Sequence, residues 1–337
     1  MPRLELSRSQ ILCFRRRVGS LDERLPAGAK SLRRAAWAGL QDSMPRAALL
    51  SIHARVERTA STTWEHPSLI QLWGPRFSAY VVAAKDLAYS RSGGCRITAP
   101  AEKGRAILLR GSTRSSMACE CRSAKPACHE RPAEQPAIRR ADGYGPAALD
   151  GAHQPVVWTA AAPNMDARNA RLELVRRYLH ILGPATAPSF ARWAGMRPAE
   201  VRTAFEALAD ELTPVHTPIG DAWILASDEA RFLAEPGPPA LARLLPSGDA
   251  YFLLWGADRT LLVQEAKRRA ALWTTRVWPG ALLVGGEIVG VWRRSAADVS
   301  IETWRRLSSK ERDAVEAEAV SLPLPGLNDP IAVRWDR

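Results

Sequence analysis

The sequence predicts an α+β protein, mainly helical, in which tandem winged-helix units are followed by a C-terminal mixed α/β region containing a hairpin. Two segments, 1–92 and 161–235, each show helical periodicity that gives way to alternating, β-branched residues. Three helices followed by a β hairpin is the order of a winged helix. The third observation is the Pro-rich linker EPGPPA, after which residues 236–337 show a mixed pattern.

In the first segment, apolar residues recur at helical spacing in 7–18 and 30–40. Pro45 suits the first turn of a third helix, PRAALLSIHARVE, because its ring already fixes a helical φ. The stretch LIQLWGPRFSAYVVAA then alternates and is rich in β-branched and aromatic residues, which predicts a strand or hairpin. We therefore assign 1–92 to an N-terminal winged helix.

The segment 161–235 shows the clearest pattern. NARLELVRRYLHILG is an amphipathic helix ended by Gly183 and Pro184, and Thr186 can cap the next helix, APSFARWAG. Pro198 opens a third helix, and LTPVHTPIGDAWIL is typical of two strands around a Gly-Asp turn. The third helix of a winged-helix unit usually enters the major groove of DNA.

In the region 236–337, TLLVQEAKRRAALW predicts a helix and SIETWRRLSSKERDAVEAEAVSL predicts a further helix or two. Between them, ALLVGGEIVGVWRR contains two apolar runs around Gly285 and Gly286, which predicts a hairpin.

The region 93–160 differs from the rest of the chain. Residues 93–148 show no sustained period, and their few apolar residues are scattered. Ordinary patterning resumes at DGAHQPVVWT. This is the pattern that a compensated frameshift would leave, so we interpret 93–160 as a degenerate or frameshifted region. Reading the genomic DNA in the alternative frame tests this hypothesis.

The net charge of +12 is unevenly distributed. The first 148 residues hold 25 Lys and Arg against 12 Asp and Glu, whereas the remaining 189 hold 22 against 23. A basic half beside a neutral half indicates an anionic partner, and we expect duplex DNA. No apolar run reaches eighteen residues and no signal peptide is recognised, so we expect no membrane partner and a cytoplasmic, nucleoid-associated location.

Four of the five cysteines lie within 34 residues, and three of them stand near a histidine: Cys119, Cys121, Cys128 and His129. The spacing C-x-C-x6-C-H is not one of the usual zinc patterns. The chain has no H-E-x-x-H motif. We therefore expect no metal and no small-molecule cofactor.

Five stretches together resemble the AlkZ-like winged-helix DNA glycosylase family and follow the family's order. They are RAAWAGLQDSMPRAALLSIHARV, LIQLWGPRFSAYVVAAKDL, RLELVRRYLHILGPATAPSFARWAGM, LLPSGDAYFLLW and PGALLVGGEIVGVWRR. The resemblance covers about three quarters of the chain. It implies three tandem winged helices in a C-shaped body around duplex DNA, so that 93–160 would be the degenerate or frameshifted middle winged helix. It also implies metal-free excision of alkylated bases and, in some members, of interstrand crosslinks.

The resemblance implies a catalytic site at Gln41, Asp42 and Ser43. The family carries Gln-x-Gln or Gln-x-Asp here, and this motif orients the attacking water. Gln41 matches the first Gln, whereas Ser43 replaces the second Gln or Asp, and a hydroxyl cannot act as a carboxylate base. Asp42 could stabilise positive charge on the sugar. The alternative is that Gln41 and Asp42 end one helix or cap the next.

Candidate DNA contacts come from two regions. Arg46 and Arg55 lie on the polar face predicted for the third helix, and Arg76 belongs to RFSAY, where the family often has Arg-Gly-Thr-Leu-His. These arginines could contact phosphates, or they could form an ordinary solvated face. Gly285 and Gly286 lie in a hairpin that resembles the family's DNA-probing hairpin, although an ordinary sheet hairpin explains the pattern equally well.

Three functional hypotheses follow. The first is a DNA glycosylase or divergent relative that contacts duplex DNA through phosphates without reading its sequence. The second is a non-catalytic winged-helix DNA-binding or regulatory protein, which Ser43 favours. The third is a degraded homologue. Because tandem units lie in one chain, we expect a monomer.

Overall fold

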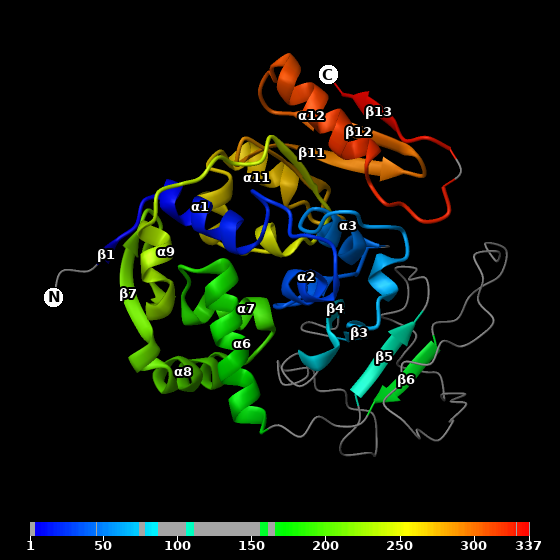
Figure 1. The fold of residues 1–337 in the computed structure, drawn as a ribbon. Coiled ribbons are helices and arrows are strands. Elements are labelled where there is room, and N and C mark those ends of the chain that lie inside the picture. Colours follow the sequence, from blue (N-terminus) through cyan, green and yellow to red (C-terminus); the bar gives the residue numbers. More distant parts are fainter. Residues whose placement is uncertain are drawn as a thin grey trace.

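The structure, a computed structural model, combines helices with three separate β sheets (Figure 1). It describes residues 4–44, 46–73, 78–86, 106–110, 156–160, 166–327 and 329–336. Within these ranges, no helix has the length and apolar character needed to cross a membrane. The hypotheses on the cysteine cluster and on most of 93–148 fall on residues outside this description.

The N-terminal part contains three helices, and the second and third contact a five-stranded sheet. The helices are α1 (Arg8–Val18), α2 (Ala29–Ala35) and α3 (Ala47–His53). In sheet order, the strands are β2 (Leu40–Gln41), β4 (Ala79–Ala83), β3 (Leu69–Trp73), β5 (Ala106–Arg110) and β6 (Val156–Ala160). Apolar residues of α2, α3, β2 and β4 share one core.

Two predicted boundaries in this part are wrong. The helix predicted over 30–40 ends at Ala35, because Gly39 adopts a φ of +85° and the next two residues pair with β4 as a strand. The helix predicted over 45–57 is confirmed only from Ala47 to His53. Gln41 therefore lies on a strand rather than at a helix end.

The segment after the middle region contains three helices and a hairpin in the predicted order, followed by a short further helix, α9 (Glu229–Leu233). The three helices and the hairpin are α6 (Ala167–Leu182), α7 (Ala187–Ala194), α8 (Pro198–Ala207), β7 (Leu212–Thr217) and β8 (Gly220–Leu225). The predicted Thr186 cap is confirmed, since its side chain accepts from the Ser189 amide. The turn lies two residues earlier than the predicted Gly-Asp turn, at Pro218 and Ile219, because Thr217 pairs with Gly220.

The start of the chain joins this segment. β1 (Leu4–Glu5) pairs in parallel with β7, forming a three-stranded sheet in the order β1-β7-β8. Ser7 and Gln10 form a capping box that fixes the beginning of α1. Phe14 then stacks on Phe232 with ring centroids 3.6 Å apart, so α1 packs on elements more than 200 residues away.

The C-terminal part is a five-stranded sheet with α12 packed on it (Figure 1). Its strand order is β13 (Ala332–Trp335), β12 (Asp298–Thr303), β11 (Glu287–Ser295), β10 (Gly280–Val284) and β9 (Ala242–Leu245). The helices are α10 (Asp258–Leu262), α11 (Ala266–Leu272) and α12 (Ser309–Val320). Short 3-10 turns occur at η1 (Thr63–Glu65), η3 (Ala84–Asp86), η4 (Ala209–Glu211), η5 (Ala226–Asp228) and η6 (Ala250–Phe252).

The predicted hairpin around Gly285 and Gly286 is confirmed as β10–β11. The single helix predicted over 260–273 is wrong, because the chain leaves the helical region at Val263 and separates α10 from α11. The stretch predicted as helical from Ser300 begins as strand β12 and becomes α12 only after Ser308.

Candidate active site

Gln41 lies at the junction of β2 with a loop from the C-terminal part. Its backbone pairs with Tyr80 of β4, and its side-chain Nε2 donates to the Ser43 hydroxyl at 3.0 Å. The same Nε2 lies 3.5 Å from the Ser78 hydroxyl. The side-chain Oε1 is buried and has no hydrogen-bond partner among the residues that the structure describes. This carboxamide therefore offers one free acceptor beside two hydroxyl groups.

Gly248 lies against the Gln41 carboxamide. It adopts a φ of +75°, which favours glycine, and a Cβ atom there would lie 3.1 Å from Gln41 Oε1. Sequence reasoning did not single out this residue. The P-S-G-D turn that contains it was the available signal, since a glycine between turn-forming residues marks a special backbone conformation. The site is thus assembled from segments about 200 residues apart.

Asp42 serves the structure around the site, because both of its carboxylate oxygens accept hydrogen bonds from neighbouring elements. One carboxylate oxygen accepts from the Ala48 amide at 3.0 Å, and the other accepts from Gln71 Nε2 at 2.7 Å. Burial raises the pKa of Asp42 to about 6, against the opposing effects of the Ala48 amide, the Arg46 charge and Gln71. Asp42 therefore joins β2, β3 and the start of α3, as the helix-cap interpretation expected.

The structure corrects the prediction for Arg55, which does not lie on a solvated face. Its side chain is buried and forms a two-pronged ion pair with Asp249, with both nitrogen–oxygen distances at 2.7 Å. It also donates to the Ser51 carbonyl, and the Ser51 hydroxyl donates to Asp249. Arg55 thus ties α3 to the loop that carries Gly248, and it is not available to a phosphate in this conformation.

The other predicted arginines differ. Arg46 is half-buried, and its guanidinium carbon lies 4.2 Å from the centroid of the Trp64 ring, an ordinary cation–π distance. It forms no part of the Asp249 ion pair and remains a candidate for DNA contact. Arg76 falls outside the described residues.

The Gly285–Gly286 turn packs against α1. Arg16 donates to the Gly286 carbonyl at 3.0 Å, and a Cβ atom at this glycine would lie 2.8 Å from Arg16 Cζ. Arg8 pairs with Glu287 on the following strand. Gly285 is exposed, but its neighbour is held by the helix, so the turn is not a free-standing tip.

A second turn joins β11 and β12, and sequence reasoning missed it. Ser295 pairs with Asp298, so Ala296 and Ala297 form the two-residue loop, and Ala296 has a φ of +49°. Arg293 and Arg294, just before the turn, are exposed. The available signal was the run RRSAAD after an apolar strand.

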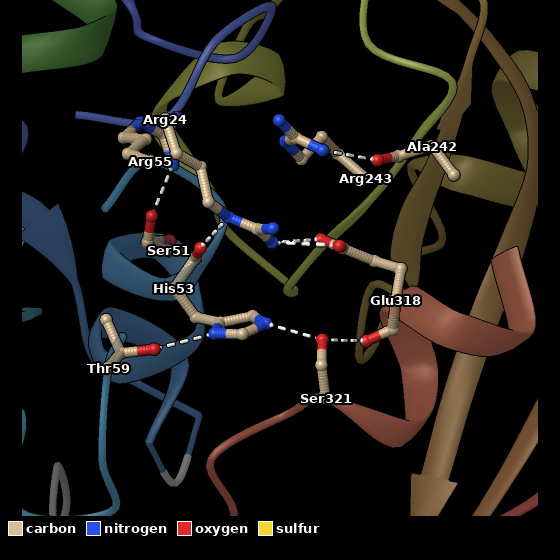
Figure 2. Close-up of polar contacts among 9 residues, drawn as sticks. All are labelled: Arg24, Ser51, His53, Arg55, Thr59, Ala242, Arg243, Glu318 and Ser321. Carbon is tan, nitrogen blue, oxygen red and sulfur yellow. Dashed lines mark hydrogen bonds and ion pairs between the residues drawn. The ribbon is translucent and has the colours of Figure 1, made fainter. Parts of the chain in front are cut away.

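Behind the site, a polar network joins α3 to α12 (Figure 2). Arg24 donates to the His53 carbonyl and forms two hydrogen bonds to Glu318, at 2.7 and 2.8 Å. The His53 ring lies between the Thr59 and Ser321 hydroxyls, at 2.6 and 3.0 Å. Because Ser321 donates to the Glu318 carbonyl, its oxygen accepts from His53 Nε2 and the Nδ1 atom accepts from Thr59. His53 is thereby held neutral.

Because of this network, the free energy of unfolding depends on pH through His53. Burial first, and then the charges of Arg24 and Arg243, lower the pKa of His53 from 6.5 to about 3. As the pH falls, His53 therefore becomes protonated at a higher pH in the unfolded chain than in the folded protein. The contribution of neutral His53 to the free energy of unfolding is fully present above pH 6.5. It falls as the pH decreases toward 3, by about 1.4 kcal/mol per pH unit.

We expect urea unfolding of the wild type to show this loss between about pH 7 and pH 5, and His53→Gln to lose less over the same interval. The comparison of the two proteins separates His53 from Asp42, whose raised pKa gives the opposite slope between 3.8 and about 6. His216→Gln, at an exposed histidine, is the matched control and should keep the wild-type slope. Equal slopes for all three proteins would contradict the assignment.

The comparisons with known proteins agree on one family. The family model described as DNA glycosylase AlkZ-like matches residues 132–322, more than half of the chain. An interstrand DNA cross-link repair glycosylase of Streptomyces sahachiroi is 31% identical over 153 residues, which span 43% of this chain and 40% of that protein. The solved Streptomyces sahachiroi DNA glycosylase AlkZ superposes with a TM-score of 0.67 and 16% identity, covering 99% of this chain and 100% of the other.

Proposed function

Because this chain belongs to the AlkZ-like DNA glycosylase family, as its sequence motifs predicted, we propose that it binds duplex DNA and excises alkylated bases by hydrolysis of the N-glycosidic bond. The observation that carries the proposal is the Gln41 carboxamide, whose buried Oε1 has no partner among the described residues. A buried acceptor of this kind needs a donor, and a water molecule supplies one.

In the proposed reaction, Gln41 Oε1 accepts a hydrogen from water and aims the water oxygen at the sugar carbon. Ser43 and Ser78 hold the amide end of the side chain, so its rotation is fixed. The bond from carbon to base breaks with its electron pair passing to the alkylated base, whose positive charge is thereby neutralised. The water oxygen bonds to the sugar carbon and its proton passes to solvent. Positioning, rather than strong base catalysis, supplies the rate.

The residues that we propose for DNA contact are chosen by their exposure and by what they pack against. We infer that 1–92 and 161–235 act as winged-helix units, with α8 placed to approach the major groove. Arg46 and Arg76 remain proposed phosphate contacts. Exposed Arg293 and Arg294 make the β11–β12 turn a better candidate for the minor groove than Gly285 and Gly286, because the latter turn packs on α1.

A second candidate function is DNA binding without catalysis. The arrangement of carboxylates favours it: Asp42 and Asp249 are both buried and hydrogen-bonded to neighbouring groups, and Ser43 offers only a hydroxyl beside Gln41. A protein with this site would bind DNA and leave its bases in place.

Base release from duplex DNA carrying 7-methylguanine separates the two functions. The glycosylase proposal expects free 7-methylguanine and an abasic strand, with no release from the undamaged duplex. Binding of the same duplex should weaken linearly on a plot of log affinity against log salt concentration. Binding without release, on 7-methylguanine and on a crosslinked duplex alike, would replace the first proposal by the second. Failure to bind any duplex would overturn both.

A further inference from the structure

The loop between β9 and η6 brings the backbone of Gly248 alongside the side chain of Gln41. Gly248 is buried, and a Cβ atom built on it would lie 3.1 Å from Oε1, 3.3 Å from Cδ and 3.7 Å from Cγ of Gln41. The first two distances are tighter than an ordinary van der Waals contact. A larger residue at this position would therefore force either the Gln41 side chain or the loop to move.

The loop is held firmly in place by Asp249, the residue after Gly248. Its carboxylate accepts from two nitrogens of Arg55, at 2.7 Å each, and from the Ser51 hydroxyl at 2.6 Å. The Asp249 amide donates to the Pro246 carbonyl at 3.0 Å, which closes the turn around Gly248. Because a buried ion pair is costly to break, the Gln41 side chain would move more readily than the loop.

Helix α3 sets the place of Gly248 and of Gln41 alike. Next to Gln41, the Asp42 carboxylate accepts from the Ala48 amide in the first turn of α3. Arg55, which pairs with the loop, lies two residues beyond the end of the same helix. The distance between Gln41 and Gly248 is therefore fixed by α3, although the two residues belong to opposite parts of the chain.

The two ends of the Gln41 carboxamide are held in different ways. At the nitrogen end, Nε2 donates to the Ser43 hydroxyl at 3.0 Å and lies 3.5 Å from the Ser78 hydroxyl. A hydroxyl can turn about its bond to carbon and follow a small movement of its partner. The backbone of Gly248 cannot turn in this way, so it limits how far the oxygen end can move.

We propose that Gly248 is a positioning residue for the reaction: the absence of a Cβ atom there lets the Gln41 carboxamide take the orientation that base excision needs. Gly248 acts through Gln41, and the proposal rests on the proposed glycosylase function. The φ of +75° alone does not explain a glycine, because asparagine also adopts this conformation. The lack of space beside Gln41 is a second and separate requirement.

Single-turnover release of 7-methylguanine, measured together with duplex affinity, tests the proposal. Gly248→Ala should lower the rate of release about tenfold and Gly248→Asn about 100-fold, since a displacement of about 1 Å costs rate on that scale. Asparagine is the sharper probe, because it tolerates a positive φ and needs more room than alanine. Duplex affinity should stay within a few-fold of the wild type, because Gly248 is buried and is not a proposed DNA contact.

Gly326 provides the matched control. Its φ is +74°, and no atom of the described residues lies within 4 Å of a Cβ built on it. Gly326→Asn therefore carries the same backbone conformation without the crowding, and should release base as the wild type does. A double variant isolates the role of Gln41: adding Gly248→Asn to Gln41→Ala should leave the residual rate unchanged.

Nuclear magnetic resonance of the free protein gives a readout that does not need base excision. With isotopic labelling of glutamine side-chain nitrogens, the signal of the Gln41 amide is the one lost in Gln41→Ala. We expect Gly248→Asn to shift this signal and Gly326→Asn to leave it in place. A shifted signal in a protein that releases no base would leave the placement of Gln41 by Gly248 standing and remove only the glycosylase proposal.

Three results would overturn the positioning role of Gly248. The first is a Gln41 signal that Gly248→Asn leaves unshifted. The second, where the wild type releases base, is an equal rate of release for Gly248→Asn and Gly326→Asn. The third is a further loss of rate when Gly248→Asn is added to Gln41→Ala, because Gly248 would then act by a route other than Gln41.

Discussion

Replacement of Gln41 by alanine is expected to lower the rate of base release by about 100- to 1,000-fold, which is the usual cost of removing one positioned hydrogen-bonding group from a reaction site. The free Oε1 acceptor disappears, so the attacking water loses the group that orients it. The Ser43 and Ser78 hydroxyls remain but no longer share a partner. Single-turnover release of 7-methylguanine measures the effect, and salt-dependent duplex binding should stay within a few-fold of the wild type.

Asp42→Asn is the matched comparison, since it changes the neighbouring side chain without changing its size. Gln71 Oε1 is buried without a partner within the described residues, so rotation of the Gln71 amide lets it accept from the new amide group. We expect Asp42→Asn to fold and to release base within a few-fold of the wild type. A loss as large as that of Gln41→Ala would instead make Asp42 a participant in the reaction. Unchanged release by Gln41→Ala would refute the proposed role of Gln41.

Replacement of Arg55 by alanine is expected to lower the free energy of unfolding by about 3–5 kcal/mol, because it leaves a buried carboxylate without its partner. Among the described residues, the donors left to Asp249 would be the Ser51 hydroxyl and the Tyr251 amide. The Asp249 side chain is fully buried, so water cannot replace the lost guanidinium without opening the loop. Chemical denaturation of Arg55→Ala and Asp249→Ala, together with the double variant, measures the coupling between the two residues.

Arg46→Ala provides the contrast. Its guanidinium lies over Trp64 and takes no part in the Asp249 ion pair, so we expect a stability change below about 1 kcal/mol. If Arg46 contacts a phosphate, the slope of log affinity against log salt falls by about 1 in this variant. The same change in slope for Arg55→Ala, with stability preserved, would restore Arg55 as a DNA contact and contradict its structural role.

The elements with a complete local signal were predictable from the sequence. The helices at 167–182, 187–194 and 198–207 combine apolar periodicity with caps or prolines, and the hairpin around 285–286 has paired glycines between apolar runs. Strand β2 was not predictable, because it is stabilised by pairing with β4 from a separate part of the chain. The start of β12 was missed because the two-residue turn that pairs it with β11 was not recognised. The pattern predicts a helix over 30–40, whereas the helix ends at Ala35 and the residues after Gly39 pair with β4.

The candidate site was predictable only in part for the same reason. The motif placed Gln41, but the roles of Asp42 and Arg55 depend on which segments cover them. Amphipathic analysis identifies the apolar face of α3 and assigns the opposite face to solvent. Here that face meets Asp249, almost 200 residues along the chain, and an arginine expected at the surface becomes part of a buried ion pair.

The pairing of β1 with β7 has a consequence for how the protein folds as it is synthesised. Leu4 pairs with Val215, which is synthesised much later. Because ribosomes add roughly 5–20 residues per second, β1 remains unpaired for about 10–40 s. During that time Ile11 and Phe14 of α1 lack their final neighbours, Ile224, Phe232 and Leu261. Helix α1 is therefore synthesised well before the segments it packs on and reaches its native packing late, which exposes its apolar face to aggregation during translation.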